Sequence, residues 1–152
     1  MQLDEVDWHT RPQQSSGLCF RCAFCTRLAD PTSERLRESA LCVSFFDTTP
    51  LNPGHALIVP RRHEVDFLAL SREELSEALE MAVEVRETLA TQFHPEGFNL
   101  GVNIGDAAGQ TIGHAHLHLI PRYSGDVPEP RGGIRWIIPE RAPYWIDQAR
   151  SS

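Results

Sequence analysis

Apolar residues recur along this chain with two different periods, and each period predicts a different kind of element. In residues 40–46, 55–60 and 98–104, short runs of strand-forming residues are bounded by turn residues and predict β-strands. Over residues 71–93, apolar residues recur every three or four positions behind a Ser-x-x-Glu capping box. This second pattern predicts one long amphipathic helix.

The order of these elements indicates the fold class. Residues 40–46 and 55–60 are separated by a turn-rich segment, so we expect these two strands to pair antiparallel. Strands, one helix and further strands, without regular βαβ alternation, predict an α+β domain in which an antiparallel sheet carries the helix. With 152 residues, the chain is long enough for one domain with its own core.

In residues 113–122 every second position from His114 to His118 is a histidine. Side chains of a strand alternate between its two faces, so a strand here would turn all three imidazoles the same way and bury the apolar residues between them. Imidazole has a pKa near neutrality and can attack, transfer a proton or bind a metal ion. The segment therefore predicts a row of reactive imidazoles.

The two ends differ from the middle of the chain. Residues 1–17 are polar and irregular and predict a flexible N-terminal arm, which leaves residues 18–122 as the domain. Residues 123–152 form a C-terminal extension rich in glycine, proline and arginine. Its tryptophans and tyrosines are too many for a solvated tail, so we expect it to pack on the sheet, on a substrate or on a second subunit.

Composition narrows the classes of function. The formal net charge of −7 argues against a nucleic-acid partner, because such binding neutralises phosphates with basic side chains. All basic residues are arginines, so lysine nucleophiles are excluded. The chain has no apolar stretch long enough to span a membrane, and its start does not resemble a secretory signal. We therefore expect a cytoplasmic protein without a membrane partner.

Three cysteines are crowded into residues 19–25, at Cys19, Cys22 and Cys25. In a chain without an export signal, such spacing indicates metal binding before disulfide formation. Two thiolates need two further ligands to complete a tetrahedral zinc site. The pair Cys19 and Cys22 is spaced as well as the pair Cys22 and Cys25.

A loop rich in small residues, Gly105–Thr111, stands just before the histidines. Glycines allow the backbone to approach a ligand closely, and backbone N–H groups with a hydroxyl can bind phosphate oxygens. Many such loops are only hairpin turns. Beside three histidines, the phosphate interpretation becomes the stronger one.

Taken together, these segments resemble the histidine-triad (HIT) superfamily, whose motif alternates histidine with apolar residues as His114–Ile120 does. Residues 46–63 are similar to the early hairpin of that family, residues 103–111 to its phosphate loop, and Cys22–Cys25 to its cysteine pair. The resemblance covers about residues 20–122 and implies the HIT-like α+β fold.

The resemblance also implies a chemistry for the site. His116 would attack the α-phosphorus of a nucleotide and form a covalent nucleotidyl-histidine, which water then hydrolyses. A backbone carbonyl at His114 would fix the tautomer of the attacking ring. His55 and His118 would flank the phosphate; Asn103, Gln110 and Thr111 would donate hydrogen bonds to its oxygens; and Asp47 would hold the ribose hydroxyls.

The family further implies a structural zinc ion and a homodimer. The ligands would be Cys22, Cys25, His63 and His114, a choice that favours Cys22 with Cys25 over the pair with Cys19. Zinc held this way would tie the cysteine segment to the strand of the attacking histidine. The dimer would pair the long helices and extend the sheet across the subunits.

These features predict a hydrolase that cleaves dinucleoside polyphosphates, such as diadenosine tetraphosphate, at the α-phosphate. Residues 121–126 look like the segment that follows the triad in such hydrolases, and nearby arginines could meet a long polyphosphate. Asn103 with Thr111 instead resembles the phosphoramidase branch. A nucleotide-binding module without turnover remains the non-enzymatic alternative, and a uridylyltransferase is disfavoured because that branch usually has glutamine at the position of His118.

Overall fold

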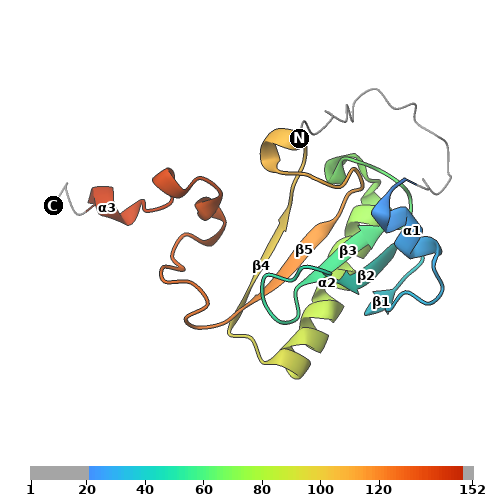
Figure 1. The fold of residues 1–152 in the computed structure, drawn as a ribbon, viewed down its shortest axis with the longest axis horizontal. Coiled ribbons are helices and arrows are strands. Elements are labelled where there is room, and N and C mark those ends of the chain that lie inside the picture. The colour runs from blue at the N-terminus through green and yellow to red at the C-terminus, as the bar shows by residue number, and fades with distance from the viewer. Residues whose placement is uncertain (1–20, 149–152) are drawn as a thin grey trace, which may run out of the picture.

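A five-stranded antiparallel sheet organises the computed structural model, which describes residues 21–148 (Figure 1). The predicted N-terminal arm, residues 1–17, lies outside the described residues. In chain order the strands are β1 (Arg37–Glu38), β2 (Cys42–Phe46), β3 (Ala56–Pro60), β4 (Gly97–Val102) and β5 (Leu117–Arg122). Across the sheet the order is β1-β2-β3-β5-β4, so β5 lies between β3 and β4. The predicted α+β class and the antiparallel pairing of β2 with β3 are confirmed.

The predicted long helix is α2 (Arg72–Phe93), which covers one face of the sheet (Figure 1). Its capping box is present in full: Ser71 accepts from the backbone of Glu74, and the Glu74 side chain accepts from the backbone of Ser71. The apolar stripe of α2 packs on β3 and β5 around Leu89 and Ile58, both fully buried. Among the described residues, no helix is long and apolar enough to cross a bilayer.

A short helix, α1 (Ala23–Ala29), covers the opposite face over β2 and β3. Phe24 and Leu28 of α1 pack there on Phe45 and Val59, which completes a second core. Because α1 is seven residues long, its sequence shows too few turns for a periodic pattern, and the sequence did not predict it. Both faces of β2 and β3 are therefore buried, and α1 brings the cysteine segment onto the sheet.

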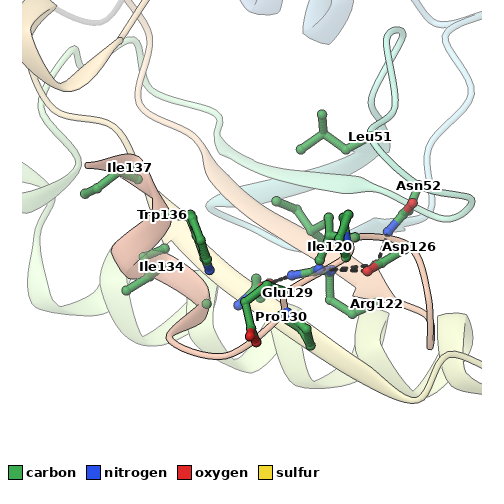
Figure 2. A pocket seen from close by; sticks show the side chains of 14 residues that line it. Leu51, Asn52, Ile120, Arg122, Asp126, Glu129, Pro130, Ile134, Trp136 and Ile137 are labelled. Atoms are coloured by element: carbon green, nitrogen blue, oxygen red, sulfur yellow. Dashed lines mark hydrogen bonds and ion pairs between the residues drawn. The ribbon is translucent and has the colours of Figure 1, made fainter. Parts of the chain in front are cut away.

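The C-terminal extension leaves the end of β5 and runs out beyond β4 (Figure 1). It consists of short helical turns: η4 (Gly133–Ile137), η5 (Pro139–Arg141) and α3 (Trp145–Gln148). A methyl group added at Gly101 of β4 would lie 3.4 Å from Cδ1 of Ile134, so η4 packs on the face of the edge strand β4. Figure 2 shows Ile134, Trp136 and Ile137 of this extension beside Ile120 and Arg122 of β5. The expectation of packing on the sheet is confirmed for η4.

Candidate active site and metal centre

The histidine segment is only partly a strand. The expectation of one strand over residues 113–122 was wrong, because β5 begins at Leu117 and both His114 and His116 precede it. The backbone of Ala115 donates instead to the carbonyl of Glu64, at 2.6 Å, which draws this segment toward the loop after β3. As a result, His114 turns toward the cysteines and away from the other two imidazoles. The apolar residues between the histidines are buried as predicted.

His116 has one ring nitrogen engaged and one available. Its Nδ1 lies 2.9 Å from the backbone carbonyl of His114, an acceptor only, so Nδ1 carries the hydrogen and donates it. The Nε2 atom therefore keeps its lone pair. The side chain is buried, with 8% of the residue exposed, and the ring of Phe24 lies 5.1 Å away between centroids. Such a ring is fixed in orientation and can act as a nucleophile through Nε2.

A second pair of imidazoles stands beside His116. The backbone N–H of Leu51 donates to Nδ1 of His55 at 3.2 Å, so the hydrogen of the His55 ring is on Nε2. That nitrogen lies 3.0 Å from Nδ1 of His118 and donates to it, which places the hydrogen of His118 on its own Nε2. The ring centroids of His116 and His118 are 4.9 Å apart. The chain of bonds therefore leaves His118 as a donor next to the nucleophilic nitrogen.

Burial keeps this pair neutral. Desolvation, followed by the neighbouring imidazoles of His116 and His55, lowers the pKa of His118 to about 4. Desolvation also lowers the pKa of His55, and Asp47 opposes that shift with its negative charge. The Asp47 carboxylate lies 3.7 Å from Nε2 of His55. At neutral pH both rings are therefore uncharged, and the tautomers above are the relevant ones.

Of the predicted phosphate and ribose ligands, Asp47 lies beside His55, and the others differ in burial and in their partners. Asp47 follows β2 and accepts from Thr49, which leaves its second oxygen toward His55. Asn103 comes just after β4 and is half-buried, and Thr111 is exposed at the end of the glycine-rich loop. Within that loop lies η3 (Asp106–Ala108). The loop therefore presents Thr111 to solvent.

Gln110 does not match its expected role. Both hydrogens of its amide are used, because Nε2 donates to the carbonyls of Val65 and Ile112, at 2.8 and 3.2 Å. Its Oε1 accepts from the backbone of Gly105 at 2.9 Å. Gln110 is buried and shapes the loop. The expectation that its amide donates to a phosphate is therefore corrected, because the amide bonds to the backbone instead.

The arginines after the triad are also engaged. Arg122 forms a two-pronged ion pair with Asp126, at 2.7 and 2.8 Å, and its third nitrogen donates to Asn99. Arg131 pairs with Glu129. The suggestion that these two arginines meet a long polyphosphate is therefore not supported.

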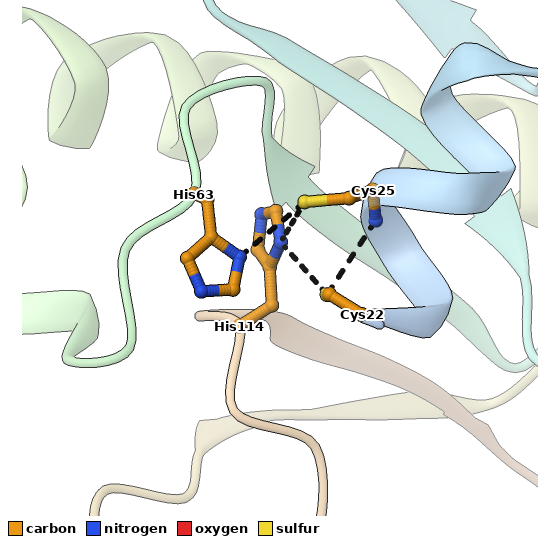
Figure 3. Close-up of side chains that lie close together, drawn as sticks. All are labelled: Cys22, Cys25, His63 and His114. Carbon is orange, nitrogen blue, oxygen red and sulfur yellow. Dashed lines mark hydrogen bonds between the residues drawn. The ribbon is translucent and has the colours of Figure 1, made fainter. Parts of the chain in front are cut away.

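Four side chains from three segments meet at one point (Figure 3). Cys22 and Cys25 come from the start of α1, His63 from the loop after β3, and His114 from the segment before β5. One ligand atom from each lies within 4.8 Å of the others. Cys19, the alternative partner of Cys22, lies outside the described residues.

The distances in this cluster fit a tetrahedral zinc ion. Nδ1 of His114 lies 3.4 Å from Sγ of Cys22 and 3.5 Å from Sγ of Cys25, and Nδ1 of His63 lies 3.3 Å from Sγ of Cys25. Zinc bonded to sulfur at about 2.3 Å and to nitrogen at about 2.0–2.1 Å in a tetrahedron places those atoms about 3.6 Å apart. The other nitrogen of His114 donates to the carbonyl of Pro60 at 2.8 Å, as is usual for a metal-bound histidine.

His114 joins the two sites. Its ring belongs to the Cys/His cluster, and its backbone carbonyl holds the hydrogen of His116. Sequence reasoning missed two further contributors: the N–H of Leu51, which orients His55, and the ring of Phe24 beside His116. The residue type gives no sign of a backbone donor, and the pattern around the cysteines does not indicate that Phe24 contacts His116.

The α+β fold and the histidine arrangement can be compared with those of known proteins, and the comparison shows the family. The model of the HIT domain matches residues 30–125, so the chain belongs to the histidine-triad family. An adenosine 5′-monophosphoramidase of Schizosaccharomyces pombe is 33% identical over 102 residues, which is 66% of this chain and 74% of that protein.

Two further proteins bear on the site. An adenylylsulfatase of Arabidopsis thaliana is 32% identical over 114 residues, 74% of this chain and 58% of that protein. The crystal structure of a zinc-bound histidine-triad family protein from Mycobacterium smegmatis superposes with a TM-score of 0.62 and 27% identity, over 84% of this chain and 96% of that one. The family thus includes proteins named as hydrolases and a member with zinc.

Proposed function

We propose that this protein is a nucleotidyl hydrolase that cleaves dinucleoside polyphosphates at the α-phosphate. The observation that carries the proposal is the available Nε2 of His116, whose ring is buried, is oriented by the carbonyl of His114 and lies beside the donor His118. A ring fixed in this way is oriented for attack before any substrate binds. The entropy of orienting the imidazole is therefore lost during folding and not during the reaction.

The reaction would proceed in two displacements. Nε2 of His116 forms a bond to the α-phosphorus, the bond from phosphorus to the bridging oxygen breaks, and the leaving polyphosphate takes a proton. His118, the donor beside His116, would supply that proton, and His55 holds His118 in the required tautomer. Water then attacks the same phosphorus, which releases a mononucleotide and restores the free imidazole.

The groups around the phosphate would stabilise the charge that develops on its oxygens. Asn103 and Thr111 lie on either side of the glycine-rich loop and supply an amide and a hydroxyl. Asp47 lies beyond His55 and is a suitable acceptor for the ribose hydroxyls. Gln110 would contribute indirectly, by fixing the loop at Gly105.

A nucleoside phosphoramidase is the second candidate. The relative from Schizosaccharomyces pombe is named as an adenosine 5′-monophosphoramidase, and Asn103 with Thr111 resembles that branch. Both reactions use the same attack on the α-phosphorus and differ only in the leaving group. Comparison of kcat/KM for diadenosine tetraphosphate and for adenosine phosphoramidate decides between them.

Mutation of the nucleophile tests the hydrolase proposal. We expect His116→Ala to lower the rate of AMP release from diadenosine tetraphosphate by at least a thousandfold. His94→Asn is the matched control, because His94 is an exposed histidine at the end of α2 with a left-handed backbone that asparagine tolerates. Turnover that persists in His116→Ala would contradict the proposal.

We also propose that Cys22, Cys25, His63 and His114 hold a structural zinc ion. All four positions of a tetrahedral ion would be taken by protein, so no position is left for water or substrate. The backbone N–H of Cys25 donates to Sγ of Cys22 at 3.5 Å, which fixes the position of this ligand atom. Elemental analysis of gently purified protein should give about one zinc per chain, and less than about half would count against the site.

We propose a homodimer built on α2 and β4. The strand β4 is the last in the sheet order and leaves a hydrogen-bonding edge open. Leu100 of β4 and Leu79 and Val83 of α2 are exposed apolar side chains. A second copy would cover them and continue the sheet. Sedimentation should therefore give a dimer, and Val83→Glu should give a monomer.

A further inference from the structure

The sheet face that carries His118 continues into a cavity that the site described above does not use. Along β5 the burial alternates, so that His118, Ile120 and Arg122 are half-buried on one face and their neighbours are fully buried on the other. On β4, Gly101 pairs with His118 and Asn99 pairs with Ile120. Ile120 therefore lies about 7 Å along the strand from His118, on the same face.

A cavity of about 770 Å³ begins at Ile120 and is walled by the C-terminal extension (Figure 2). Ile134, Trp136 and Ile137 line it from η4, and Leu51 lines it from the loop after β2. Leu51 is also the residue whose N–H orients His55. The cavity therefore lies next to the histidine site in two places, along β5 and at the loop of Leu51.

The chemistry of the lining selects the kind of ligand. Most of the lining is apolar, with one indole, and such surfaces bind flat aromatic rings by stacking. Its charges are already compensated, because Arg122 pairs with Asp126 and Glu129 pairs with Arg131. A phosphate chain would have no available cation to pair with on these residues. An uncharged base would enter the cavity with only a small desolvation cost.

We propose that this cavity is a leaving-group subsite that binds the second nucleoside of a dinucleoside polyphosphate, with its base beside Trp136. The inference rests on the proposed function and specifies it further. The α-nucleotide would stay at His116, the bridging phosphates would pass His118, and the distal base would enter between Ile120 and the extension. All of η4 lies after residue 125, where the family match ends, so this wall of the subsite belongs to the chain's own extension.

The test compares two substrates with the same reacting phosphate. Diadenosine tetraphosphate and adenosine 5′-tetraphosphate share the α-phosphate and differ by the second nucleoside. We expect kcat/KM of the wild-type protein to be about tenfold higher for the dinucleotide, the change expected for one stacked base. Trp136→Ala should remove that advantage and leave kcat/KM for adenosine 5′-tetraphosphate within twofold.

The Trp136 indole donates to the carbonyl of Arg131, so removal of the indole can move η4. A second pair of variants therefore tests the cavity without removing this hydrogen bond. Ile137 lines the cavity and Ile138 does not, and both are exposed, at 77% and 50%. Ile137→Ala should lower kcat/KM for the dinucleotide about threefold, and Ile138→Ala should leave it unchanged.

The outcomes separate the two proposals. A wild-type protein that releases AMP from neither compound overturns the hydrolase proposal and the subsite together. Equal kcat/KM for both compounds, or equal losses on both in Ile137→Ala, overturns the subsite alone. A loss in Ile137→Ala that accompanies a change in sedimentation would assign the cavity to a contact between two copies and also overturn it.

Discussion

The neutral, buried pair of His55 and His118 makes the stability of this protein sensitive to acid. The pKa of His118 is about 4 in the folded protein, against about 6.5 in the unfolded chain. Between these two values the unfolded chain binds a proton that the folded protein does not. The contribution of His118 is therefore complete above pH 6.5 and is lost as the pH falls toward 4.

The size of this effect follows from the two pKa values. Between pH 7.5 and pH 5.0 the linkage relation gives a loss of about 2 kcal/mol in the free energy of unfolding from His118 alone. Because the ring is only half-buried, solvent screening reduces the expected loss to about 1–2 kcal/mol. His55 adds to it in the same direction, because burial also lowers its pKa.

Urea unfolding at both pH values measures this loss, and His118→Gln isolates it. Glutamine keeps a hydrogen-bonding side chain but does not titrate, so the variant should lose about 1–2 kcal/mol less than the wild-type protein over the same pH interval. Acid also protonates the Cys/His cluster, but that contribution is common to both proteins and cancels in the difference. An identical pH dependence in the two proteins would refute the reasoning.

Three further predictions concern metal and stability. Cys25→Ser should lose bound zinc and unfold at a lower temperature than the wild-type protein, measured by elemental analysis and calorimetry; an unchanged metal content would exclude Cys25 as a ligand. Leu89→Ala should cost about 2–5 kcal/mol in urea unfolding, because Leu89 is fully buried under the sheet, whereas exposed Leu68→Ala should change it by less than about 0.5 kcal/mol. Ser71→Ala should cost about 1 kcal/mol, because it removes half of the capping box; no change would mean that the cap is not stabilising.

The sequence predicted those parts of the fold whose patterns are local. The helix α2 is predictable from local sequence, because the capping box and the apolar stripe both depend on residues that are close together in the chain. The strands β2 and β3 are marked by strand-forming runs on either side of a turn. In contrast, β1 and α1 are too short for a period to develop, and they exist because the rest of the sheet gives them a surface to pack on.

The site was predictable as a set of residue types and not as a geometry. His116 and the Cys/His cluster have spacings that indicate their chemistry, and the structure brings each set together. The strand β5 begins later than predicted, at Leu117, because the backbone N–H of Ala115 donates to the carbonyl of Glu64. These two residues are far apart in the chain. The structural use of Gln110 and Arg122 likewise depends on partners that only the folded chain supplies.

The central claim is that Nε2 of His116 bonds to the α-phosphorus during turnover. A rapid quench in alkali preserves a phosphorus–nitrogen bond, and peptide mapping by mass spectrometry then locates it. With diadenosine tetraphosphate, we expect an adenylyl group on the peptide that contains His116, present in the wild-type protein and in His94→Asn and missing in His116→Ala. Full turnover without any adduct, or an adduct on another peptide, would contradict the account.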